Sequence, residues 1–116
     1  MAKQDNMRAL SIRQPYAEQI LQGTKKIEYR SRPTNIRERV FIYASMTPGS
    51  DDDFASMRAR SGDFPVGVLV GTVEIVDCAG EVEDYHWHLA KSERLEKPIK
   101  VETHPQPVWF NPFKKC

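Results

Sequence analysis

The strongest constraint on the fold is a long apolar segment, residues 64–78, which is dominated by β-branched and aliphatic side chains. Such composition favours an extended strand over a helix. Gly67 and Gly71 interrupt the segment on one face, which is typical of a sharply coiled or bulged strand in a small barrel. The segment is too short for a membrane-spanning helix, which needs about 18 apolar residues.

A second strand is expected at residues 39–44, where Val40, Ile42 and Ala44 alternate with Phe41 and Tyr43. Both faces are apolar, which favours a strand buried between two layers. The remaining short strands are expected at residues 8–12, 27–30, 85–89, 94–101 and 108–110, and short helices at residues 15–21 and 50–59.

Several short strands with one or two short helices, and no alternating strand–helix rhythm, predict an α+β domain built around a small β-barrel. With 116 residues, the chain has room for one domain. We expect that domain to span residues 8–116, behind a flexible N-terminal tail at residues 1–7.

The formal net charge is only +1, so general electrostatic attraction to nucleic acid is not expected. The basic residues nevertheless gather in the first third of the chain, which weakly indicates a surface that faces a polyanion. They are Arg8, Arg13, Lys25, Lys26, Arg30, Arg32, Arg37 and Arg39. Two lone cysteines, Cys78 and Cys116, form no disulfide framework or zinc motif and indicate a reducing cytoplasm.

The most informative polar stretch is residues 23–30, GTKKIEYR. Gly23 fits just past the end of the helix expected at residues 15–21, because glycine readily adopts a left-handed backbone. If residues 27–30 are extended, Glu28 and Arg30 share one face, and Lys25 lies just before them. These side chains could recognise an anion or a planar polar ligand, or move a proton. The same spacing also describes a solvated strand face with a surface ion pair.

Other chemistry finds less support in the sequence. His86 and His88 would face one side of a strand, but no further ligands complete a metal site. No serine-nucleophile or phosphate-loop motif is present. We therefore predict neither a metal nor a cofactor. Aromatic residues such as Tyr16 and Trp87, close to basic residues in the sequence, could stack on bases or simply pack in the core.

The chain closely resembles the ASCH domain family (activating signal cointegrator homology) over about residues 8–113. The resemblance rests on residues 10–17, LSIRQPYA, followed by the pattern Gly-x-Lys-x-x-Glu-x-Arg at Gly23, Lys25, Glu28 and Arg30. Residues 70–74, VGTVE, and the segment around Trp87 fit as well. The resemblance implies a PUA-like barrel with a cleft beside its first helix.

What the resemblance implies for function is binding of RNA, or of a modified nucleoside or nucleotide, in that cleft. The residues carried over as the ligand-binding set are Gln14, Tyr16, Lys25, Glu28, Arg30 and Trp87.

An enzyme is the first alternative. One bacterial branch of this family hydrolyses the acetyl amide of acetylated cytidine with a lysine, a threonine and a glutamate. Lys25 matches the lysine, and Glu28 would be its catalytic partner if the chain is an enzyme. Glu28 stands where that branch has threonine, Thr24 has the wrong offset, and the glutamate could be Glu74, Glu81 or Glu83. The second alternative is a module that binds a partner protein.

Overall fold

The computed structural model describes residues 6–114. Most of the tail predicted at residues 1–7, and Cys116, lie outside the described residues. The elements in chain order are β1 (Ala9–Ile12), α2 (Tyr16–Gln22), β2 (Ile27–Arg30), β3 (Arg39–Ala44), α3 (Asp51–Ala55), β4 (Val68–Glu81), β5 (Asp84–Ile99) and β6 (Trp109–Phe110).

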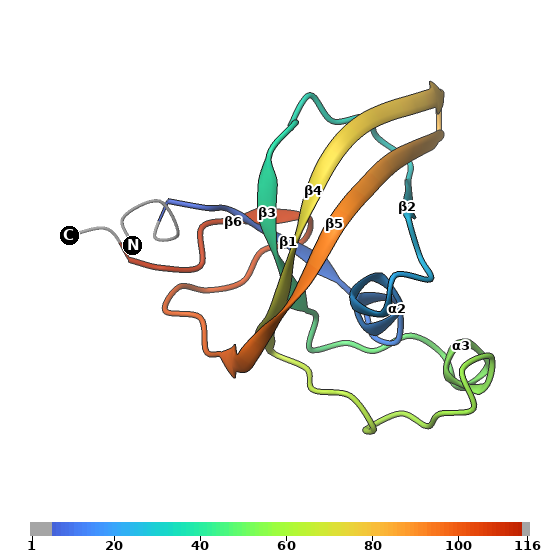
Figure 1. The fold of residues 1–116 in the computed structure, drawn as a ribbon, viewed down its shortest axis with the longest axis vertical. Coiled ribbons are helices and arrows are strands. Elements are labelled where there is room, and N and C mark those ends of the chain that lie inside the picture. The colour runs from blue at the N-terminus through green and yellow to red at the C-terminus, as the bar shows by residue number, and fades with distance from the viewer. Residues whose placement is uncertain (1–5, 115–116) are drawn as a thin grey trace.

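The strands form one mixed sheet in the order β2-β5-β4-β3-β1-β6. Strands β1 and β3 are parallel, and every other neighbouring pair is antiparallel. Figure 1 shows β4 and β5 as a long curved hairpin, with α2 beside the sheet and α3 farther out. The expected α+β class with short helices is confirmed.

Strand β3 lies between two apolar cores, as its alternation predicts. Val40, Ile42 and Ala44 join the larger core, to which α2 adds Ala17 and Ile20. Phe41 and Tyr43 join a second core with Phe110 and Leu69. Burial on both faces explains why neither set of alternating positions is polar.

Helix α2 is short and depends on contacts outside itself. It ends at Gly23, whose φ of 83° is the left-handed conformation that glycine adopts without strain. Its Glu18 carboxylate, 8% exposed, accepts hydrogen bonds from both terminal nitrogens of Arg94 on β5, at 2.8 and 2.7 Å. This bidentate ion pair ties the helix to the sheet.

Three expected boundaries were wrong. The strand expected at residues 64–78 begins at Val68 and runs to Glu81, and the two strands expected at residues 85–89 and 94–101 are the single strand β5. Register shifts between β4 and β5, and a φ of 52° at Lys91, break the alternation that would have shown one long strand. The helix expected at residues 50–59 is limited to Asp51–Ala55, with Ser50 as its capping residue.

Gly71 lies where two elements approach closely. A Cβ atom there would collide with the side chain of Leu21 on α2 and would lie 2.5 Å from the carbonyl oxygen of Glu93 on β5. The sequence therefore has glycine at this point because no larger residue fits.

The sheet does not close into a barrel by backbone pairing within residues 6–114, because β2 and β6 are its edge strands and do not pair with each other. Side chains bridge the opening instead. Arg30 on β2 donates a 2.9 Å hydrogen bond to the carbonyl oxygen of Ser11 on β1. Trp87 on β5 and Trp109 on β6 stack with centroids 5.9 Å apart. We call this opening between β2 and β1/β6 the seam.

Candidate functional site

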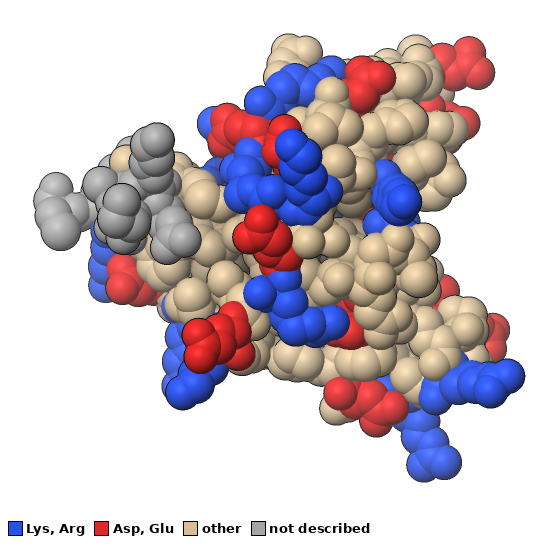
Figure 2. Space-filling view, in the orientation of Figure 1, with Lys and Arg blue, Asp and Glu red and all other residues tan. Residues whose placement is uncertain are grey.

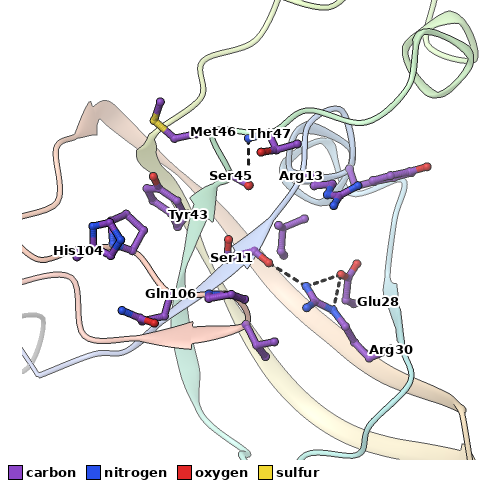
Figure 3. A pocket seen from close by; sticks show the side chains of 15 residues that line it. Ser11, Arg13, Glu28, Arg30, Tyr43, Ser45, Met46, Thr47, His104 and Gln106 are labelled. Atoms are coloured by element: carbon purple, nitrogen blue, oxygen red, sulfur yellow. Dashed lines mark hydrogen bonds and ion pairs between the residues drawn. The ribbon is translucent and has the colours of Figure 1, made fainter.

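A cleft of about 920 Å³ lies along the seam. Figure 3 shows its lining side chains, with Arg13, Glu28 and Arg30 toward one end and Tyr43, Met46 and His104 toward the other. The volume falls within the range of small-molecule sites, about 300–1,000 Å³. The full lining set is Ser11, Ile12, Arg13, Tyr16, Glu28, Arg30, Tyr43, Ser45, Met46, Thr47, His104, Pro105, Gln106, Pro107 and Val108.

The end of α2 fixes the position of Lys25. After the turn at Gly23, the backbone N–H groups of Thr24 and Lys25 both donate to the carbonyl oxygen of Gln19, at 3.1 and 3.2 Å. The chain then enters β2, which pairs with β5 and turns Glu28 toward the seam. The glycine, the helix end and the short strand together place Lys25 beside Glu28.

Lys25, Glu28 and Arg30 form one charged cluster. Glu28 Oε2 accepts a 2.8 Å hydrogen bond from Arg30 Nε and lies 2.7 Å from Arg30 Nη2 in an ion pair, and Lys25 Nζ lies 3.5 Å from Glu28 Oε1. All three side chains are largely buried, at 15%, 11% and 21% exposed for lysine, glutamate and arginine. One carboxylate between two cations leaves the cluster with one net positive charge.

Two tyrosines flank the lysine of the cluster. Lys25 Nζ lies 5.4 Å from the ring centre of Tyr16 and 5.2 Å from that of Tyr29, within the range of cation–π contacts. A hydrogen bond to the carboxylate of Asp53 raises the pKa of Tyr16. Tyr16 lines the cleft, and its contact with a ligand stays a prediction.

Two predicted ligand-binding residues lie behind the cleft wall. Gln14 is 1% exposed, and both ends of its side-chain amide bond within the protein. The amide nitrogen donates to the carbonyl of Pro65 and the amide oxygen accepts from the backbone N–H of Glu18, both at 3.0 Å. Trp87 is 2% exposed, donates to the carbonyl of Arg32 and lies 5.5 Å from the Arg30 guanidinium. Neither residue lines the cleft, and neither does Lys25, which borders it through its contact with Glu28. Ligand contact by any of the three stays a prediction.

The structure also brings in residues that motif reasoning missed. Tyr43 comes from β3, and His104 and Gln106 come from the loop between β5 and β6. In the sequence, Arg13 is one of several basic residues with nothing to single it out as a site residue. In the structure it is exposed and lines the cleft. The one local signal for the loop is its alternation of polar residues with prolines at residues 104–107.

The basic residues of the first third do not form one open patch. Arg8 pairs with Glu38, Arg39 pairs with Glu93, and Arg30 is held in the cluster. On the face shown in Figure 2, Lys and Arg lie interspersed with Asp and Glu. The side chains of Arg13, Lys26 and Arg32 have no hydrogen bond or ion pair with any residue of the described range 6–114, and of these three only Arg13 lines the cleft.

A hydrolytic set does not assemble around Lys25 among the described residues. The hydroxyl of Thr24 donates to the carbonyl of Gln19 at the helix end. Glu81 and Glu83 lie at the turn of the β4–β5 hairpin, and Glu74 pairs with Arg39 in the register of β3 and β4. None of these residues lines the cleft.

One histidine of the pair, His86, has other partners. His86 Nε2 lies 3.2 Å from Asp84, and its ring packs edge-on against Tyr29. Within residues 6–114, no group of three or more His, Cys, Asp or Glu side chains is placed to hold a metal ion. The same residues contain no helix with the length and hydropathy to cross a membrane.

Comparison with known proteins decides the family. The sequence model of the ASCH domain matches residues 10–113. This chain belongs to the ASCH domain family. The human protein "Activating signal cointegrator 1" is 30% identical over 83 residues, and its mouse counterpart matches equally. Both alignments cover 62% of this chain, which spans only 14% of the length of either relative.

The fold is also that of a solved ASCH protein. The crystal structure of ASCH from Zymomonas mobilis superposes with a TM-score of 0.61, at 15% sequence identity. The match covers 90% of this chain and 86% of that one. At that identity the likeness concerns the fold, and it confirms the ASCH-like architecture expected from residues 10–17 and 23–30.

Proposed function

We propose that this ASCH domain binds RNA, or a modified nucleoside or nucleotide, in the cleft along the seam. The observation that carries the proposal is the Lys25–Glu28–Arg30 cluster, whose Glu28 and Arg30 line a cleft of about 920 Å³. The cluster has a net positive charge in a largely buried setting, where cations interact strongly with phosphates and base carbonyls. The free guanidinium of Arg13 adds a second positive charge.

The shape of the site supports a single nucleotide unit better than a long strand. A strand-binding surface is an extended basic groove with stacked aromatic residues. Here Arg8, Arg39 and Arg94, which lie outside the cleft, are paired with carboxylates. The cleft itself combines apolar walls with a few converging polar groups. That combination is typical of small-ligand sites. A free thiol at Cys78 fits the reducing cytoplasm in which we place this activity.

The test is a thermal-shift and calorimetric screen of nucleosides, nucleoside monophosphates and short single-stranded RNAs. A ligand at 100 times its Kd stabilises the fold by about 2.7 kcal/mol, which raises the Tm by several degrees. Lys25→Ala is the informative variant, because Glu28 keeps its hydrogen bond and its ion pair with Arg30. Lys97→Ala is the matched control, since Lys97 is exposed on β5 and does not line the cleft.

Weaker binding in Lys25→Ala, with native affinity in Lys97→Ala, supports the proposal. Equal affinities in the two variants contradict a role for the cluster. A native protein that responds to none of these compounds contradicts nucleotide binding altogether, and leaves the partner-protein alternative.

A further inference from the structure

The far end of the cleft contains the hydroxyl group of Tyr43, a residue whose ring is otherwise buried. Tyr43 is 2% exposed, and its ring packs edge-on against Phe110 with centroids 5.1 Å apart. Its hydroxyl has no hydrogen-bond partner within residues 6–114. Yet no polar side-chain atom in that range is both fully buried and unpartnered, so the hydroxyl is not sealed in the core. Because Tyr43 lines the cleft, the cleft is where its hydroxyl is accessible.

Burial also determines what the hydroxyl can do. Loss of solvation raises the pKa of Tyr43, so the group is protonated at neutral pH and offers a hydrogen-bond donor. Because the hydroxyl reaches the cleft and has no partner within residues 6–114, a ligand that supplies an acceptor at this point can accept its hydrogen bond. The chemistry of this end therefore selects for a carbonyl oxygen or a ring nitrogen.

The neighbouring loop adds adaptable polar groups in a stiff frame. His104 and Gln106 are exposed, line the cleft and have no side-chain partner within residues 6–114. Pro105 and Pro107 fix φ on either side of Gln106, which lowers the entropy lost when the loop is ordered by a ligand. An amide both donates and accepts, which suits the edge of a base.

The two ends of the cleft differ in chemistry. Two arginines, Arg13 and Arg30, line the cleft, and both lie toward the end opposite Tyr43 (Figure 3). Met46 and the two prolines give the Tyr43 end apolar walls. A phosphate is favoured beside the guanidinium groups, and a planar heterocycle is favoured between apolar walls with a few donors and acceptors.

We infer that Tyr43, His104 and Gln106 form a base-reading subsite. A nucleobase lies against the apolar wall, with the Tyr43 hydroxyl donating to a base carbonyl or ring nitrogen and the Gln106 amide pairing with the base edge. The phosphate of the same nucleotide lies at Arg13. This inference rests on the proposed function, and it names the ligand as a phosphorylated nucleotide, free or within RNA.

The experiment measures binding by calorimetry and by NMR titration. The probes are the four 5′-ribonucleoside monophosphates, a triribonucleotide, and ribose 5-phosphate, which lacks a base. Tyr43→Phe removes the hydroxyl and keeps the ring in the core. Tyr85→Phe is the matched control, because Tyr85 packs against the larger core and does not line the cleft. Arg13→Ala reports on the phosphate end.

The expected results separate the two ends. Tyr43→Phe lowers the affinity for the nucleotides that the native protein binds by about tenfold and alters their order of affinity. It leaves the affinity for ribose 5-phosphate unchanged. Arg13→Ala weakens ribose 5-phosphate and the nucleotides alike. Tyr85→Phe binds as the native protein does. A preference for the triribonucleotide over the monophosphates identifies RNA as the source of the nucleotide, and the reverse identifies a free nucleotide.

Two failures remain distinct. If the native protein binds nucleotides and Tyr43→Phe binds every one of them with native affinity, the base-reading subsite is refuted and the proposed function stands. If the native protein binds none of these probes, the subsite is refuted, and if it also binds none of the nucleosides in the screen above, the proposed function is refuted as well.

Discussion

Removing the charge of Glu28 tests whether the cluster is a buried electrostatic unit. Glu28 is held by a hydrogen bond and an ion pair from Arg30 and by Lys25 at 3.5 Å, and its side chain is 11% exposed. In Glu28→Gln, shape is retained, but two cations lose their counter-charge. Breaking a buried ion pair by removing one partner costs about 3–5 kcal/mol. Because Lys25 and Arg30 keep some solvent contact, we expect about 2–4 kcal/mol.

The assay is urea unfolding followed by circular dichroism, with Glu38→Gln as the matched control. Glu38 pairs with Arg8 at 3.1 Å, but the two side chains are 45% and 43% exposed, so the loss there is about 0–1 kcal/mol. With an m-value of about 2 kcal/mol per molar urea, the middle of the range for small proteins, Glu28→Gln lowers the midpoint by about 1–2 M. If the two variants unfold at the same urea concentration, the cluster is not the buried unit described above.

Two further predictions concern how α2 is held. Arg94 lowers the pKa of Glu18 below its ordinary value of 4.5, so the contribution of this pair to stability is complete above that pH and is lost as the pH falls through the lowered pKa. Arg94→Met is expected to flatten this loss in unfolding experiments between pH 5 and 2, and an unchanged pH profile contradicts the linkage. Gly71→Ala adds a methyl group against Leu21 and the backbone of Glu93, and we expect it to destabilise the fold by about 1–3 kcal/mol in thermal denaturation; a native Tm contradicts the steric argument.

The sequence predicts the local features of the fold well. Alternation at residues 39–44 predicts a strand with two apolar faces, and Gly23 predicts the end of α2, because both patterns act over a few residues. The common face of Glu28 and Arg30 follows from the two-residue period of a strand, and the structure confirms it. The length of β5 could not be predicted, because its irregular register with β4 hides the period on which the prediction depends.

The rest of the site could not be predicted because it is assembled across the seam. Arg30 bonds to a backbone carbonyl at Ser11, 19 residues away, and a backbone acceptor leaves no trace in the residue pattern. Tyr43 reads as a core residue in its strand, and His104 and Gln106 read as a polar loop. Only the topology, which places β1 between β3 and β6, brings these residues to one cleft.

The seam gives Arg30, the arginine of the motif, a structural role. Arg30 bonds to Glu28 and to Ser11, and it lies over the ring of Trp87. It therefore helps to join the two open ends of the sheet, so Arg30→Ala disturbs the cleft wall whether or not a ligand touches it. Arg13 has no such contacts within residues 6–114, so its loss removes only a charge that faces the cleft. Weaker phosphate binding in Arg13→Ala therefore identifies a ligand contact, whereas the same result in Arg30→Ala does not.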